Sequence, residues 1–152
     1  MSKSTPSTTF PIPFEDQLKL LCPRYGITAL YLFGSGAREI AERMSGQVIP
    51  RENSESDVDI GVQPAPSKRL TAQERVRLAI ELEDLLGAKR VDLVVLPEAD
   101  PFLALDVIRG EMLYCADPDA QAEDELYVLR RAGDLAHFAR DRWQHLLSGA
   151  AS

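Results

Sequence analysis

The 152-residue sequence predicts an α/β (α+β) fold, with a central mixed sheet of about four strands flanked by helices and with a long C-terminal helix. Three observations support this fold class. Four apolar runs have the length of strands, segments of helical periodicity lie between them, and Gly or Pro ends most segments of both kinds. The hydrophobic fraction of 45% is ordinary for a globular protein, so a packed core is expected.

The first part of the chain alternates helix and strand after a polar start. Residues 1–12 are rich in Ser, Thr and Pro and predict a disordered tail. Changes in apolar period and the positions of Gly and Pro then divide the sequence. The expected elements are a helix at Phe14–Arg24, a strand at Thr28–Phe33, a helix at Gly36–Ser45, a polar loop at Gly46–Glu55 and a strand at Val58–Val62.

The second part predicts two more strands and three more helices. The helix at Thr71–Leu86 has a T-x-x-E capping box and Gly87 as its stop. Its expected buried face comprises Val76, Ala79, Ile80, Leu82 and Leu86. The remaining elements are a strand at Val91–Leu96, a helix at Pro101–Arg109, a strand at Met112–Cys115 and a helix at Asp119–Leu147, in which Gly133 is the point where a break would occur.

Composition excludes several classes of protein. A net charge of −7 and a pI near 4.8 argue against nucleic-acid binding through a general basic surface. No apolar run reaches the roughly 18 residues of a membrane span, and the start lacks signal-peptide features, so a cytoplasmic protein is expected. Cys22 and Cys115 are far apart and lie in apolar runs, which indicates buried thiols rather than a disulfide or a zinc site.

A glycine-rich turn follows the first expected strand. Gly34-Ser35-Gly36 lies between a buried strand and a helix, where backbone N–H groups and a helix N-terminus can receive a phosphate. The turn is neither a Walker loop nor a full dinucleotide fingerprint, because no Gly-Lys-Ser/Thr follows and Glu39 replaces the third glycine. A plain strand-to-helix turn is the alternative interpretation.

Three acidic residues lie on the next two expected strands. Asp57 and Asp59 are two residues apart on one strand, so both project from the same face, where they repel unless a divalent cation lies between them. Asp92 lies in an apolar run and completes a three-carboxylate cluster suited to Mg²⁺ or Mn²⁺ if the two strands pair. The alternatives are a turn-capping Asp57 with a solvated Asp59, and an edge-strand Asp92 paired to Lys89 or Arg90.

These segments together resemble a known family. Leu32-Phe33-Gly34-Ser35-Gly36-Ala37-Arg38, Ser56-Asp57-Val58-Asp59-Ile60-Gly61-Val62 and Val91-Asp92-Leu93-Val94 are similar to the motifs of minimal nucleotidyltransferases (MNT) of the DNA polymerase β superfamily. Ile108 to Tyr114 resembles the closing helix and strand of those proteins. The resemblance implies a nucleotidyltransferase domain at 13–117, followed by a helix at 118–152 packed on the same domain.

The resemblance also implies residue roles. Gly34 and Ser35 would hold the triphosphate of ATP, and Ser56 would be a further nucleotide-binding residue. Arg38, near the start of the helix after the turn, could reach the phosphates, and an exposed helical arginine is the alternative. Asp57, Asp59 and Asp92 would be the catalytic metal ligands, with Mg²⁺ or Mn²⁺ as the metal. Two features depart from the family pattern. The family usually has Arg-Gly where this chain has Arg38-Glu39, and the spacer of 21 residues from Gly36 to Ser56 is longer than usual.

Little sequence remains after Asp117, so a separate domain for a large acceptor is not expected. The resemblance implies an Mg²⁺-dependent protein adenylyltransferase, the antitoxin of a HEPN/MNT toxin–antitoxin pair, which transfers AMP from ATP to a tyrosine of a HEPN ribonuclease. The alternatives are a binding module that neutralises its partner by contact, and a stand-alone enzyme acting on a small hydroxylated molecule. No nucleic acid or membrane is expected as a partner, and a homo-oligomer stays open.

The last helix admits two further interpretations. Arg131 with His137, and Arg140 with His145, match the Arg-x(4–6)-His spacing of HEPN ribonucleases, but one helix cannot form the helical bundle that such a site needs. The apolar residues of the helix indicate core packing or a partner surface, with core packing favoured; they are Leu126, Leu129, Phe138 and Trp143.

Overall fold

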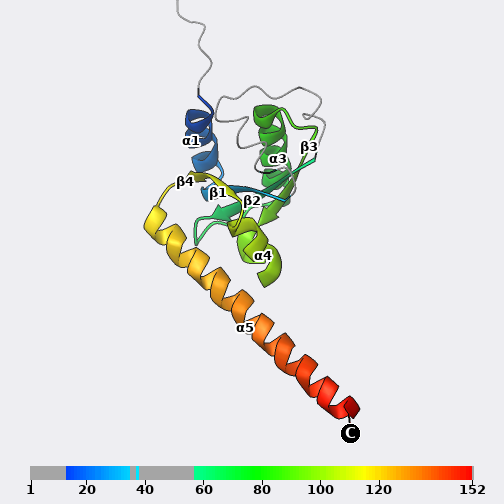
Figure 1. Ribbon diagram of the computed structural model, residues 1–152. Helices are drawn as coiled ribbons and strands as arrows, with labels where there is room; N and C mark the ends of the chain where they lie inside the picture. The colour runs from blue at the N-terminus through cyan, green and yellow to red at the C-terminus, as the bar shows by residue number, and fades with distance from the viewer. Residues whose placement is uncertain (1–12, 35–36, 38–56, 152) are drawn as a thin grey trace, which may run out of the picture.

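The computed structural model describes residues 13–34, 37 and 57–151, with side chains to residue 147 (Figure 1). The predicted tail at 1–12, the helix at Gly36–Ser45 and the loop at Gly46–Glu55 therefore lie outside the described residues, except for Ala37. The elements are α1 (Phe14–Arg24), β1 (Ile27–Phe33), β2 (Asp57–Pro64), α3 (Ala72–Leu86), β3 (Arg90–Val95), the short helix η2 (Leu96–Glu98), α4 (Pro101–Ile108), β4 (Glu111–Cys115) and α5 (Pro118–Ala151).

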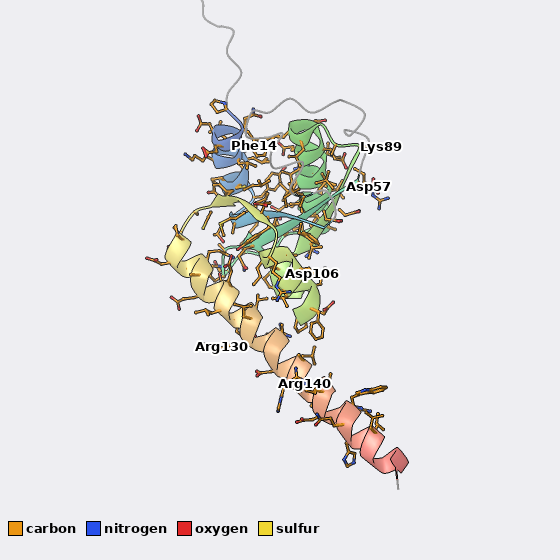
Figure 2. All side chains as sticks on the ribbon, viewed as in Figure 1. Phe14, Asp57, Lys89, Asp106, Arg130 and Arg140 are labelled. Atoms are coloured by element: carbon orange, nitrogen blue, oxygen red, sulfur yellow. The ribbon has the colours of Figure 1, made fainter. Side chains whose placement is uncertain are left out.

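The four strands form one mixed sheet in the order β3-β2-β1-β4. β1 pairs antiparallel with both β2 and β4, whereas β2 pairs parallel with β3 through the α3 crossover. The parallel pairing brings the starts of β2 and β3 to one end of the sheet, where Asp57 and Lys89 lie close together in Figure 2. The predicted fold of a four-stranded mixed sheet flanked by helices, with a long C-terminal helix, is confirmed.

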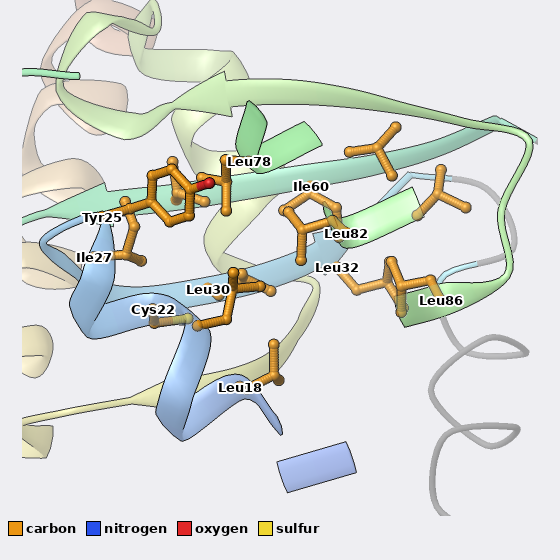
Figure 3. Packing of buried hydrophobic residues seen from close by; sticks show 14 of the residues in the cluster. Leu18, Cys22, Tyr25, Ile27, Leu30, Leu32, Ile60, Leu78, Leu82 and Leu86 are labelled. Atoms are coloured by element: carbon orange, nitrogen blue, oxygen red, sulfur yellow. The ribbon is translucent and has the colours of Figure 1, made fainter. Parts of the chain in front are cut away.

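Alternation along the strands divides the core between the two faces of the sheet. The first face carries Leu30, Leu32 and Ile60 and is covered by α1 and α3, through residues such as Leu18 and Leu78 (Figure 3). The opposite face carries Ala29, Tyr31 and Phe33 and packs against Ala104 and Val107 of α4. Successive strand residues therefore face different helix layers, and the layer on the α4 side is the smaller one.

The ends of α3 confirm the sequence prediction, but its buried face differs. Thr71 and Glu74 form both hydrogen bonds of the capping box, and Gly87 ends the helix in the left-handed conformation. The stripe that meets the sheet is Leu78, Leu82 and Leu86. Val76 and Ile80, predicted to be buried, are 59% and 51% exposed, because the four-residue repeat from Leu78 places them on the outer side.

Helix α5 is continuous through Gly133, so the break considered there does not occur. A Cβ at Gly133 would meet nothing within 4 Å, so close packing does not explain the glycine. The helix is attached to the α4 side of the sheet by Tyr31, whose hydroxyl donates to Glu125 and accepts from the Gln121 amide at 2.8 Å. Gln121 is almost fully buried, so this network fixes the first turns of α5.

The predicted core packing of the apolar residues of α5 is wrong. Leu126, Leu129, Phe138 and Trp143 are all exposed, because the body covers only the face that contains Gln121 and Ala132. Every residue from 137 to 147 is exposed, and α5 extends beyond the sheet (Figure 1). Among the described residues, no helix is long and apolar enough to cross a membrane.

The two cysteines are free thiols, in agreement with the absence of a disulfide framework. Cys22 of α1 is buried, and burial raises the pKa of its thiol to about 12. Cys115 was also predicted to be buried, but it is only partly covered, because it ends an edge strand just before α5.

Candidate functional site

The three predicted carboxylates share one face at one end of the sheet. Asp59 is the direct register partner of Asp92, and Asp57 lies two residues nearer the start of β2. Val58 and Ile60 point into the core beneath α1 and α3, so Asp57 and Asp59 lie on the α4 side. The condition under which Asp92 joins the cluster, pairing of its strand with β2, is met.

Among the described elements, α4 covers only part of this face. Val107 of α4 packs directly over Gly61, where an added Cβ would overlap the Val107 side chain. Asp59 lies two residues farther toward the start of β2 and is half-buried, and Asp57 is exposed. The cover of the sheet therefore ends where the carboxylates begin, so they lie at a boundary between protein and solvent.

Arg90 adds a positive charge to the cluster. It is the register partner of Asp57, and its Nε lies 3.2 Å from Oδ1 of Asp92. β3 is an edge strand, so the alternative reading of Asp92 as an edge residue paired to Arg90 is also realised. The two interpretations are compatible, since Asp92 both faces Asp59 and is ion-paired along its own strand. Both side chains are substantially exposed, so the pair adds little to stability.

The electrostatic cost of the cluster falls on Asp59. Burial raises the pKa of its carboxyl, and the negative charges of Asp92 and then Asp57 raise that pKa further. A carboxylate in this situation is stabilised by any cation brought to the same face. The arrangement therefore favours binding of positive charge next to Asp59.

Gly34 is required at this place for two reasons. Its φ of +84° lies in the left-handed region, which disfavours residues with a Cβ. A Cβ at Gly34 would also overlap Oδ2 of Asp59, which is the register partner of the preceding residue Phe33. Gly34 was predicted to bind phosphate, and in the structure its lack of a side chain also makes room for the Asp59 carboxylate.

Other predicted site residues have no described geometry. Ser35, Arg38 and Ser56 lie outside the described residues. The sequence indicates Arg90 only as an alternative ion-pair partner of Asp92. Its position opposite Asp57 follows from the register of the parallel strands, which the sequence does not specify.

The donor set has the chemistry that Mg²⁺ or Mn²⁺ requires, namely several carboxylate oxygens on one face. The absence of a side chain at Gly34 lets the Asp59 carboxylate lie on this face without a clash. Within the described ranges, however, no three acidic, His or Cys side chains are grouped tightly enough to hold a metal as they stand. The three carboxylates thus suit a divalent metal in their ligand chemistry and in the face they share, although they are not gathered closely around one point.

A family comparison identifies the domain that carries this cluster. Residues 16–119 match the model described as polymerase beta, nucleotidyltransferase. The chain belongs to this nucleotidyltransferase family. The match spans the whole sheet and both motif-bearing strands of the acidic cluster, so the nucleotidyltransferase resemblance drawn from the sequence is confirmed.

Solved structures of similar fold extend over α5 as well. A toxin–antitoxin crystal structure with AMP-PNP is 25% identical, with a TM-score of 0.56, and the match covers 91% of this chain and 98% of the other. The MNT antitoxin fold also appears in a complex with a tri-AMPylated HEPN toxin from Shewanella oneidensis, at 23% identity and a TM-score of 0.54, covering 91% of this chain and 97% of that chain. No curated protein matches the sequence.

Proposed function

We propose that this nucleotidyltransferase is an antitoxin that transfers AMP from ATP to a hydroxyl, preferably of tyrosine, on a partner HEPN ribonuclease toxin. The observation that carries the proposal is the register of Asp59 with Asp92 beside Gly34, in a chain of the polymerase beta family. Two of the similar solved structures support the choice of substrate and partner, since one contains AMP-PNP and the other an AMPylated HEPN toxin.

Each site residue has a separate role in this proposal. Gly34 and Ser35 bind the triphosphate, and Arg38 and Ser56 contact the nucleotide. Asp57, Asp59 and Asp92 would hold divalent metal, which supplies positive charge to the phosphates and to the acceptor oxygen when bound. The raised pKa of the Asp59 carboxyl supports this role, because a cation relieves the repulsion among the three carboxylates.

The transfer balances as an in-line displacement at the α-phosphorus. The acceptor hydroxyl oxygen forms a bond to that phosphorus, the bond from the α-phosphorus to the bridging oxygen of the β-phosphate breaks, and pyrophosphate leaves with the electron pair. The Asp92 carboxylate accepts the hydroxyl proton. The products are an AMP-modified hydroxyl and pyrophosphate, and no oxidant or reductant is required.

The test is incorporation of labelled AMP into a HEPN-type protein that is supplied as the candidate partner. Wild type with Mg²⁺ is expected to label the partner, whereas Asp57→Asn and Asp59→Asn should lower labelling at least about a hundredfold, as expected for loss of a group that acts on the transition state. Arg75→Gln, which removes an ion pair to Glu98 on η2, is the matched control and should label normally. Absence of labelling by wild type would refute the activity, and normal labelling by Asp57→Asn would refute the site.

A second function is favoured by one observation. Because Arg90 is ion-paired with Asp92 and offsets part of its charge, the cluster can exist without a metal, as in an antitoxin that acts only by contact. In that case a partner would be neutralised equally by wild type and by the Asp57→Asn, Asp59→Asn double variant, with no AMP transferred. A ribonuclease assay on the mixed proteins, with and without ATP, distinguishes the two functions.

A further inference from the structure

The second half of α5 is a helix without cover from its own chain. Ala136 is the last partly covered side chain, and all residues from 137 to 147 are exposed. Phe138 and Trp143 are 61% and 63% exposed, and Leu146 and Leu147 are exposed to a similar degree. Large apolar side chains grouped in this way on a projecting segment are typical of an interaction site.

The exposed apolar side chains gather on one side of the helix. At about 100° per residue, Phe138, Leu135, Leu146, Trp143 and Leu147 fall within an arc of about 180°. The opposite arc carries polar residues, among them His137 and Asp141, which lie 3.3 Å apart as an ion pair if the histidine is protonated. The segment is therefore amphipathic, and its apolar side has the width of about half the helix.

This width favours an occupant with more than one helix. A seam between two single helices uses about two residues in seven, so residues 137–147 would supply about three per copy. Even at the roughly 150–250 Å² that an aromatic side chain buries, three such residues stay below the about 800 Å² per partner of a stable interface. A second copy pairing through this segment alone is therefore too small, and a groove between two helices of a partner fits the arc better.

Charge indicates what surrounds such a groove. Arg142 lies within the apolar arc, between Phe138 and Leu146 at four-residue spacings, and Arg140 borders it next to Leu147. In the part of the chain that the structure describes, neither arginine makes an ion pair. The chain as a whole carries −7. Two arginines left unpaired in an acidic protein fit a partner surface that bears carboxylates.

We propose that the projecting half of α5 is the docking surface for the toxin, inserting Trp143, Leu146 and their apolar neighbours between two helices of that protein, with acidic side chains facing Arg140 and Arg142. This inference rests on the proposed function for the identity of the partner. The surface itself is argued from the exposure, arc and charge of this helix.

The docking surface is separate from the acidic cluster. Asp57 lies at one end of the molecule and Arg140 on the projecting helix beyond the body (Figure 2). Between them, α5 is held by the Tyr31 network, which fixes the direction of the projecting half relative to the sheet. The toxin is thus held at α5 while another part of it reaches the carboxylates. Binding and transfer are therefore expected to respond to different substitutions.

The experiment measures binding of the same candidate HEPN-type protein, unmodified, by isothermal titration calorimetry, without ATP. The double variant Trp143→Ala, Leu146→Ala should weaken binding at least about thirtyfold, as hot-spot truncations do. The control Gln144→Ala, on the polar side of the same turns, should stay within about threefold. Arg142→Glu should weaken binding, and salt should weaken the binding of this variant less than that of wild type, because the charge reversal replaces a screened attraction by a screened repulsion. All variants should keep the thermal shift that wild type shows with ATP and Mg²⁺.

Several outcomes would overturn the inference. Equal binding by wild type and the double variant excludes the surface. A wild-type dimer by light scattering that becomes monomeric in the double variant assigns the surface to a second copy. Sedimentation of wild type, but not of the variant, with vesicles of phosphatidylcholine and phosphatidylserine assigns it to a membrane. If the HEPN protein does not bind wild type while ATP still raises the melting temperature, the partner is wrong and the nucleotide site stands.

Discussion

At the scale of single residues, the site depends on one contact between a glycine and a carboxylate. Gly34 has a positive φ and lies directly against Asp59, whereas Gly87 has a similar φ of +67° and open space around it. The two glycines therefore separate the effect of backbone strain from the effect of contact. The sequence marks both as turn residues, but it cannot show that one of them faces a carboxylate from another strand.

The first prediction compares these glycines. Gly87→Ala should cost about 1 kcal/mol through the left-handed conformation alone. Gly34→Ala should cost about 1–3 kcal/mol and lower the melting temperature by about 2–4 °C per kcal/mol, because the new methyl also displaces the Asp59 carboxylate. Thermal melts with and without ATP and Mg²⁺ check this. If Gly34→Ala loses no more ligand-induced stabilisation than Gly87→Ala, the contact has no role in the site.

The second prediction concerns the pH dependence of Asp59. Its folded-state pKa is raised by burial and by Asp92 and Asp57, so its ionised form opposes folding at neutral pH. This penalty disappears as pH falls through the folded-state pKa toward the unfolded-state value near 3.8. Asp59→Asn should therefore be more stable than wild type at neutral pH without divalent metal, and the difference should shrink as pH falls. Urea denaturation in EDTA across this range checks it, and a difference that is constant with pH would contradict the repulsion.

At the scale of elements, local signals specify most boundaries. The capping box and Gly87 of α3, the glycine after β1 and the Asp100 cap of α4 act within a few residues, so each is readable from the sequence. The buried stripe of α3 was predicted less well, since Val76 and Ile80 fit an apolar pattern that the sheet does not use. Local pattern gives the element, but the packing partner decides which of its sides is buried.

The third prediction tests the attachment of α5. Tyr31→Phe removes a hydroxyl that joins Glu125 and Gln121, so a buried amide loses its acceptor at a cost of about 1–3 kcal/mol. Amide exchange should increase in the first turns of α5, as measured by hydrogen–deuterium exchange. The matched control is Tyr25→Phe, which removes the bond to Glu81 on the opposite face of the sheet. If both variants loosen α5 equally, the network does not fix this helix.

At the scale of the whole molecule, the pairing of strands decides how much of the site is predictable. Asp57 and Asp59 share a face by alternation alone, so their proximity follows from the sequence, while the place of Asp92 depends on the parallel register with β2. The pairing of Asp92 with Arg90 rather than Lys89 agrees with the spacing, because Arg90 and Asp92 are two residues apart on β3 and share a face, whereas Lys89 precedes the strand. For α5, apolar spacing cannot distinguish burial in the chain from burial in a partner.

The fourth prediction is a truncation. A chain that ends after Ala136 loses residues 137–147, whose side chains are all exposed, together with the last five residues, so its melting temperature should change by no more than about 2 °C. Its response to ATP and Mg²⁺ should be that of the full chain, while binding of the HEPN protein should be lost. A chain that ends after Leu129 also loses the buried Ala132 and should melt lower. A large stability loss in the first truncation would show that residues after 136 support the fold.

The exposure of every side chain from 137 to 147 has an evolutionary consequence. Substitutions there are nearly neutral for folding, and they leave the acidic residues on the sheet untouched. Drift along this stretch can therefore change which protein is recognised while the chemistry is inherited intact. Among descendants of one ancestral gene, divergence should accumulate fastest on the apolar side of the last turns, in step with changes in the cognate protein.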